Sequence, residues 1–162
     1  MTNRGLAVLV AVAVVAGIGI AAYGLATNGS SKPTRVLQID EVNGRVGKVV
    51  LGEASANVEA VLGEPSSSER SLLRYPHLVV GLDPAARVVR IETDDPDAQT
   101  EKVVKVGDPI SAVRAAYRKA AKCVPNAPDK HDPHPRCAVR VPAGRLLVKG
   151  DPIERMTLAR TG

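Results

Sequence analysis

Residues 51–65, LGEASANVEAVLGEP, are followed 55 positions later by a near copy, residues 106–120, VGDPISAVRAAYRKA. In each stretch a glycine, Gly52 or Gly107, precedes an acidic residue and then a run in which apolar residues recur three or four positions apart. That spacing is typical of one face of an amphipathic helix. The duplication therefore predicts two related helices, each opening one half of an internally repeated domain.

The two helices are delimited by their sequence signals. Gly63 and Pro65 end the first, because glycine and then proline commonly follow the last turn of a helix. Acidic Glu53 and Asp108 precede the two runs, where a helix N-terminus favours negative charge. The predicted apolar faces are Ala54, Val58, Val61 and Leu62 in the first helix and Ile110, Val113, Tyr117 and Ala121 in the second.

Short apolar segments separated by turn residues follow each helix. Asp83-Pro84 and Asp151-Pro152 each indicate a turn, because proline presets φ for the second position of a turn. The two turns occupy equivalent places in the two halves. The expected strands are 71–75, 78–82 and 87–93 in the first half, 137–141, 145–149 and 154–160 in the second, and a short extra strand at 36–39. An isolated helix with three strands buries too little surface to be stable, so the two copies are expected side by side. The predicted fold class is α+β, with two α-β-β-β repeats forming one antiparallel sheet and both helices on one face.

These motifs resemble a known family. The Leu-Gly-acidic start, the helix end Val-x-x-x-Leu-Gly-x-Pro at 58–65 and the strand RVVRIE at 87–92 resemble SmpA/OmlA-like small envelope lipoproteins and the β-lactamase inhibitor protein-like tandem-repeat fold. The resemblance covers residues 44–160. It implies helices packed on a small antiparallel sheet, and protein–protein binding at the cell envelope without catalysis. Two departures stand out: Glu53 replaces the usual methionine, and no lipobox cysteine follows the apolar N-terminus, so a lipid anchor is not implied.

The N-terminus is an uncharged, apolar segment, residues 5–26. As a helix it would be about 33 Å long at ~1.5 Å per residue, enough to cross a bilayer core of about 30 Å. A cleaved signal peptide is the alternative, although its apolar core is usually about 7–15 residues. We expect a single-pass membrane anchor with the following domain outside the cytoplasm. The expected organisation is a cytoplasmic N-terminus at 1–4, the anchor or signal at 5–26, a linker with a short strand at 27–43, and repeats at 44–97 and 98–162.

Charge is divided unevenly along the chain. Residues 34–113 contain 9 Lys/Arg and 13 Asp/Glu, a balance of −4, whereas residues 114–160 contain 11 Lys/Arg and 4 Asp/Glu, a balance of +7. One interpretation is that the two halves are simply solvated or face each other. The other is a basic face turned toward an anionic surface, where each Lys or Arg contributes about 1 kcal/mol.

The segment CVPNAPDKHDPHPRC, residues 123–137, gathers the reactive residue types of the chain. In an oxidising compartment Cys123 and Cys137 are expected to form a disulfide. A zinc site formed by Cys123, His131, His134 and Cys137 is the alternative, although C-x7-H-x2-H-x2-C departs from familiar zinc spacings. Two free thiols would follow if the domain were cytoplasmic.

Several function classes find no support. No nucleophile, phosphate-binding or dinucleotide-binding motif occurs, so we predict neither a catalytic site nor a cofactor. Glu53 and Asp108 could form a catalytic carboxylate pair. Each is explained more simply as an acidic residue that favours its own helix N-terminus. The acidic segment 92–101 lacks the glycine of a calcium loop and is interpreted as a solvated linker. With no Phe or Trp in the chain, stacking on single-stranded nucleic acid is not expected either.

The sequence thus predicts a non-catalytic, membrane-anchored extracytoplasmic module that binds another envelope protein or an anionic envelope component. An envelope metal sensor using the 123–137 loop and a cell-wall enzyme are the alternatives. The sheet face opposite the helices is the expected contact surface, with outward side chains Arg74, Arg90, Arg140 and Lys149.

Overall fold

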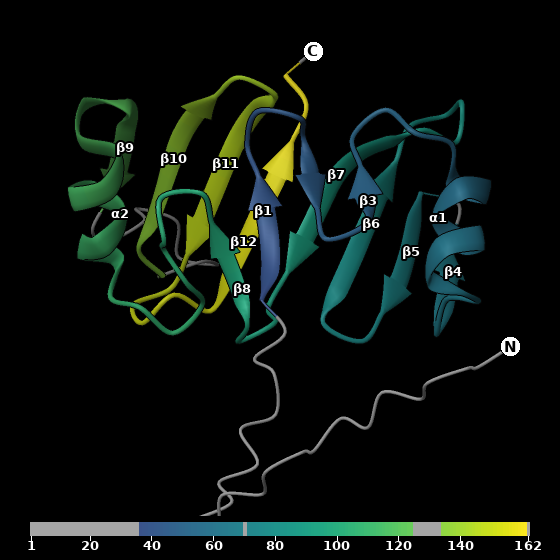
Figure 1. Ribbon diagram of the computed structural model, residues 1–162, viewed down its shortest axis with the longest axis horizontal. Helices are drawn as coiled ribbons and strands as arrows, with labels where there is room; N and C mark the ends of the chain where they lie inside the picture. The colour runs from purple at the N-terminus through teal and green to yellow at the C-terminus, as the bar shows by residue number, and fades with distance from the viewer. Residues whose placement is uncertain (1–35, 70, 125–133, 162) are drawn as a thin grey trace, which may run out of the picture. The chain divides into compact units, whose positions relative to one another are not determined.

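The computed structural model describes residues 36–69, 71–124 and 134–161 (Figure 1). They all belong to the second of two compact units, Pro33–Gly162, and the structural statements below concern that unit alone. The predicted span 5–26 lies outside the described residues. Within the described ranges, no helix is long and apolar enough to cross a membrane.

Eight antiparallel strands form one large sheet in the order β4-β5-β6-β7-β12-β11-β10-β9. The first half of the sheet consists of β4 (Ser67–Glu69), β5 (Leu72–Tyr75), β6 (Leu78–Leu82) and β7 (Val88–Thr93). The second half consists of β9 (Ala121–Val124), β10 (Arg136–Val141), β11 (Gly144–Lys149) and β12 (Arg155–Ala159). The halves meet at β7 and β12, where Ile91 lies opposite Leu158.

A second, four-stranded sheet has the order β3-β2-β1-β8. Its strands are β1 (Leu37–Asp40), β2 (Arg45–Val46), β3 (Val49–Val50) and β8 (Ala98–Thr100). β1 pairs in parallel with β8 and antiparallel with β2. Asp40 closes the turn between β1 and β2, because its carboxylate accepts the backbone N–H of Asn43 at 2.9 Å and the side-chain N–H of Asn43 at 2.8 Å. These bonds from Asn43 lower the pKa of Asp40. In Figure 1 the small sheet lies in front of the middle strands of the large one.

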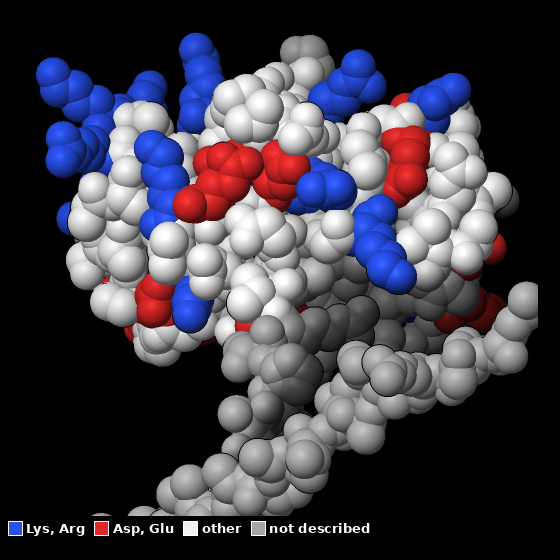
Figure 2. All heavy atoms as spheres, in the orientation of Figure 1, with Lys and Arg blue, Asp and Glu red and all other residues white. Residues whose placement is uncertain are grey.

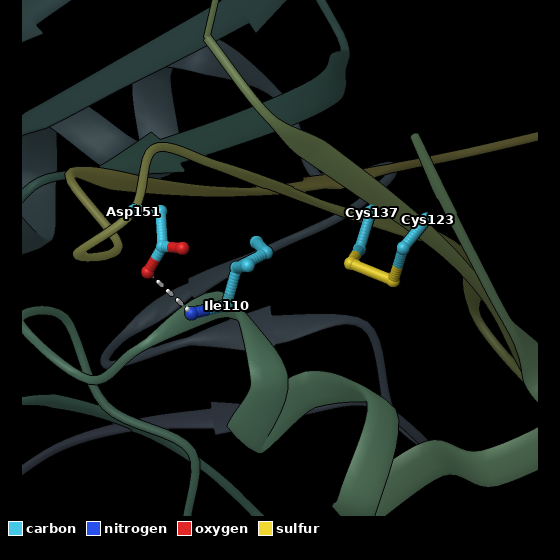
Figure 3. Close-up of a disulfide and its surroundings, with 4 residues drawn as sticks. All are labelled: Ile110, Cys123, Cys137 and Asp151. Carbon is cyan, nitrogen blue, oxygen red and sulfur yellow. Dashed lines mark hydrogen bonds between the residues drawn. A yellow bond between two sulfur atoms is a disulfide. The ribbon is translucent and has the colours of Figure 1, made fainter. Parts of the chain in front are cut away.

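Two short helices complete the unit, α1 (Ser55–Leu62) and α2 (Ile110–Tyr117), and a 3-10 turn, Arg118–Ala120, follows α2. α1 ends at Gly63, whose φ of 86° is strained for any residue with a side chain and whose N–H bonds to the carbonyl of Glu59. At the start of α2, the backbone N–H of Ile110 donates to Oδ1 of Asp151 at 3.0 Å (Figure 3). Asp151 comes from the turn between β11 and β12, so a tertiary contact satisfies an amide that a helix leaves unpaired.

One hydrophobic core joins these parts. α2 buries Ile110, Val113 and Tyr117, and α1 buries Val58. They join the same cluster as inward-facing residues of the large sheet and residues of the small sheet, such as Ile39. Burying a side chain of this size stabilises the fold by about 1.5–3 kcal/mol. The two helices, the small sheet and the large sheet therefore contribute to one continuous core.

The predicted fold class was wrong. The described chain is mostly β-sheet with two short helices, and the large sheet has eight strands where six were expected. The three strands expected after each helix occur as β5–β7 and β10–β12, but β4 and β9 extend them at the sheet edges. The strand expected near 36–39 joins the separate small sheet and not the edge of the large one. The sequence does not indicate these additional strands because they are short or polar. All residues of β4 are exposed, and β2 and β3 have two residues each, so none of them shows an alternation of apolar and polar residues.

The helix predictions also need correction. Val61 is 47% exposed although it was assigned to the inner face of α1, and Ala121 belongs to β9 because α2 ends at Tyr117. The buried face of α2 at Ile110, Val113 and Tyr117 is confirmed.

Glu53 and Asp108 do not cap the helices, whose N-cap residues are Ala54 and Pro109. Each carboxylate instead accepts the backbone N–H three residues earlier, Glu53 from Val50 at 2.7 Å and Asp108 from Lys105 at 2.9 Å. The two positions are equivalent in the repeat and brace equivalent turns, so the duplication extends to this contact.

Candidate binding surface

The second half of the large sheet exposes one face to solvent. Along β11 the burial alternates strictly: Leu146 and Val148 are buried, whereas Arg145 and Leu147 are exposed. Successive side chains of a strand point to opposite faces, so this alternation identifies the uncovered face. Through the strand pairings, the same face carries Lys122, Val124, Arg136, Ala138, Arg140, Arg145, Leu147, Lys149, Arg155 and Thr157.

Cations lie directly opposite one another on this face. Arg140 pairs in register with Arg145 across β10 and β11. Lys149 lies opposite Arg136 on one side and opposite Arg155 on the other. Like charges in directly opposed positions destabilise a sheet by roughly 0.2–1 kcal/mol each. We therefore expect these opposed cations to lower the stability of the sheet, and an anionic ligand that neutralises them would reduce that cost.

Acidic side chains in the described part of the chain neutralise few of the arginines on this face. Glu92 on β7 lies 3.0 Å from the guanidinium of Arg155. Among the described residues no carboxylate forms an ion pair with Arg136, Arg140 or Arg145. The first half of the sheet differs, because there Arg74 faces Glu69 at 3.9 Å. Most of the excess positive charge on this face therefore lies in the second half of the sheet.

The surface is hollowed. An open hollow of about 520 Å³ is lined by residues of β7 and β9–β12, with Leu147 in its lining and cations around it. A second hollow of about 560 Å³ adjoins it, sharing Lys122, Ala138 and Arg145 and adding Arg140 and Lys119. We call this combined region the basic hollow. Figure 2 shows the opposite side of the unit, where the small sheet lies and where acidic and basic side chains are interspersed.

Three of the four predicted contact residues lie together. Arg90 and Lys149 line the hollow of about 520 Å³, and Arg140 lines the adjoining one. Arg74 lies on β5 in the other half of the sheet and lines a smaller depression of about 220 Å³, which shares only Glu92 and Arg155 with the first hollow. Sequence reasoning missed Lys122, Arg136, Arg145, Arg155 and Leu147. The alternation along 136–140 and 145–149 is visible in the sequence. The pairing of Arg140 with Arg145 instead follows from the hairpin register, in which Val141 pairs with Gly144 across the two-residue turn Pro142-Ala143.

The predicted disulfide between Cys123 and Cys137 is confirmed (Figure 3). The two residues are directly opposite each other on β9 and β10, with Cα atoms 4.0 Å apart. Cys137 is buried, so the bond lies on the core side of the sheet, beneath the basic hollow. It ties the edge strand β9, which carries Lys122 and Val124, to the rest of the sheet.

The alternative zinc site is incompatible with this bond, because both sulfur ligands are consumed by it. Among the described residues no group of three or more metal-ligating side chains gathers. His134 instead lies 3.4 Å from the carboxylate of Glu154, and His131 lies outside the described residues.

A buried polar pair lies away from the basic hollow, between α2 and the small sheet. The hydroxyl of Tyr117 donates to Oε1 of Glu41, and both side chains are almost fully buried. Burial raises the pKa of Glu41, an effect that the Tyr117 hydrogen bond opposes. Burial and the bond to Glu41 raise the pKa of Tyr117. Lys102 lies over the Tyr117 ring, 5.2 Å from its centroid. The pair joins the β1–β2 turn to α2, which is a structural role.

Comparison of the chain with protein-family models, curated proteins and solved structures gave no match, so function has to be inferred from the surface itself.

Proposed function

We propose that this chain is a non-catalytic binding module of the cell envelope, which holds an acidic region of another protein in the basic hollow. The observation that carries the proposal is the opposed pair Arg140 and Arg145, with which no carboxylate of the described residues forms an ion pair. An arrangement that weakens the isolated sheet is compensated when an anionic partner neutralises it. The apolar Leu147 within the hollow favours a protein partner, because it offers a nonpolar contact among the charges.

The location belongs to the same proposal. The apolar segment 5–26 anchors the chain in a membrane and the described unit lies outside the cytoplasm. The Cys123–Cys137 disulfide supports this placement, since such bonds persist in oxidising compartments and are rare in the cytosol. Alkylation of intact cells tests it. Cysteines that resist alkylation until reductant is added support the placement, and thiols labelled without reductant, only after permeabilisation, contradict it.

Site-specific cross-linking tests the partner. A photoreactive residue replaces Leu147 in the hollow, and in a control chain it replaces Val61, which is exposed on α1. We expect irradiation of cells to give a discrete protein adduct from position 147 and not from 61. The double substitution Arg140→Glu/Arg145→Glu should abolish the adduct, whereas Arg74→Glu in the other half of the sheet should leave it.

Two outcomes contradict this proposal. An adduct unaffected by Arg140→Glu/Arg145→Glu means that the basic hollow does not hold the partner. An adduct that resists protease digestion and stains as polysaccharide or polyphosphate assigns the surface to an anionic envelope polymer instead of a protein.

A further inference from the structure

The basic hollow has an internal order of charged and apolar rows. On β10, Arg136, Ala138 and Arg140 occupy alternate, outward positions. Ala138 lies opposite Leu147 on β11, and this apolar pair separates the cations at the two ends. One end is Arg136 and the other is Arg140 with Arg145. Along the strand direction, the basic hollow therefore presents a cationic side chain, an apolar pair and a second cationic group, in that order.

The spacing of these rows is that of a β-strand. A strand rises about 3.3 Å per residue, so Arg136 and Arg140 have Cα atoms about 13 Å apart, with Ala138 midway. An extended peptide repeats its side chains on one face at the same interval of two residues. In a helix, residues four apart are separated by only about 6 Å along the axis. A helical partner with acidic residues four apart would reach one end of the hollow and not both.

On these grounds, and resting on the proposed function, we propose that the basic hollow recognises an extended protein segment with the pattern acidic-x-apolar-x-acidic. Its two carboxylates contact Arg136 at one end and Arg140 with Arg145 at the other. Its central apolar side chain covers Ala138 and Leu147. Leu147 is 39% exposed although it is a large apolar residue. The central apolar side chain of the bound segment would remove Leu147 from water, which is favourable.

The alternative source of negative charge is a phosphate polymer. It presents charge at every repeat and nothing apolar, so it would leave Ala138 and Leu147 without a nonpolar contact. The apolar row between the two cationic ends therefore favours a peptide. The two sources are distinguished by the response of binding to changes at Leu147, since only the peptide contacts it through an apolar group.

Fluorescence anisotropy with the purified full-length chain tests the pattern. One labelled peptide carries Glu-Thr-Leu-Thr-Glu between neutral flanks, and a second peptide has the same composition with adjacent glutamates, Glu-Glu-Thr-Leu-Thr. We expect the alternating peptide to bind at least tenfold more tightly than the rearranged one. Arg136→Glu and Arg140→Glu should each weaken its binding at least tenfold, and Arg74→Glu should leave it unchanged. Circular dichroism of each variant checks that the fold is kept.

Leu147→Ser supplies the decisive comparison. It should weaken the alternating peptide severalfold and leave the rearranged peptide almost unchanged, because only the former places its leucine on this side chain. Equal affinities of the two peptides overturn the pattern. So does tighter binding of soluble polyphosphate than of the alternating peptide, unaffected by Leu147→Ser. If neither peptide binds while the cellular adduct from position 147 still depends on Arg140 and Arg145, the pattern falls and the proposed function stands.

Discussion

Glu41 is an ionisable residue that the fold almost fully buries, with 4% of its surface exposed. Burial raises its pKa above the ordinary value of 4.5, so the folded chain holds this proton more tightly than the unfolded chain. The contribution of Glu41 to stability is therefore complete below about pH 4.5 and is lost as the pH rises through the folded-state pKa.

Glu41→Gln tests this sign, because glutamine keeps an acceptor for Tyr117 and does not titrate. We expect the wild-type free energy of unfolding, measured relative to the variant by urea denaturation, to decrease between pH 4 and pH 7. A difference that stays constant over this range would show that Glu41 titrates alike in the folded and unfolded chains.

The disulfide between Cys123 and Cys137 is expected to contribute to the stability of the unit. Cys123 and Cys137 are 14 residues apart, and closing a loop of about 15 residues stabilises a domain by about 3 kcal/mol in the chain-entropy model. Cys123→Ser/Cys137→Ser should lower the melting temperature by on the order of 10 °C, as measured by calorimetry. The wild-type chain under reducing conditions is the matched control and should melt with the double variant. A wild-type chain insensitive to reductant would contradict this expectation.

At the scale of elements, α2 depends on a residue from a distant turn. Asp151 accepts the backbone N–H of Ile110, and loss of a comparable capping side chain costs about 1 kcal/mol. Asp151→Ala should lower the free energy of unfolding by about that amount and speed hydrogen exchange at the Ile110 amide. Asp151→Asn retains an acceptor and should lose less. Equal losses in the two variants would mean that the side-chain acceptor does not account for the effect.

In β10 and β11 of the large sheet, successive side chains point in turn toward the core and toward the basic hollow. Leu146 is fully buried and its neighbour Leu147 is exposed, so adjacent leucines on β11 serve packing and binding separately. This separation is what allows substitutions in the basic hollow to be made without opening the core.

We expect repulsion between the opposed cations of the basic hollow to lower the free energy of unfolding of the whole unit. Arg145→Thr removes the charge opposite Arg140 and should raise the free energy of unfolding by several tenths of a kcal/mol. Added salt screens exposed charges, so the gain should shrink as ionic strength rises. Thermal melts at low and high salt measure both effects.

Arg74→Thr is the control, since Arg74 lies opposite Ser67 and Val79 and near Glu69, and no gain is expected from it. If Arg145→Thr destabilises the chain at low salt, the opposed cations are not under repulsion, and the argument for an anionic partner weakens.

Several features of this fold depend only on local sequence pattern. The buried face of α2 at Ile110, Val113 and Tyr117, the end of α1 at Gly63, the strands β5–β7 and β10–β12 and the Cys123–Cys137 pair all follow from periodicity, turn chemistry and residue type. Each is decided by residues close together in the chain or by a chemistry with few alternatives.

The tertiary structure alone decided the rest. The strands β2, β3 and β8 of the small sheet and the edge strands β4 and β9 form because a neighbouring strand supplies their hydrogen bonds, and two to four residues show no period of their own. Asp151 reaches α2 across 41 positions of sequence. The pairing of Arg140 with Arg145, and of Lys149 with Arg136 and Arg155, depends on register, which no single strand encodes. The sequence placed positive charge in the second half of the chain, and only strand pairing gathered it into one surface.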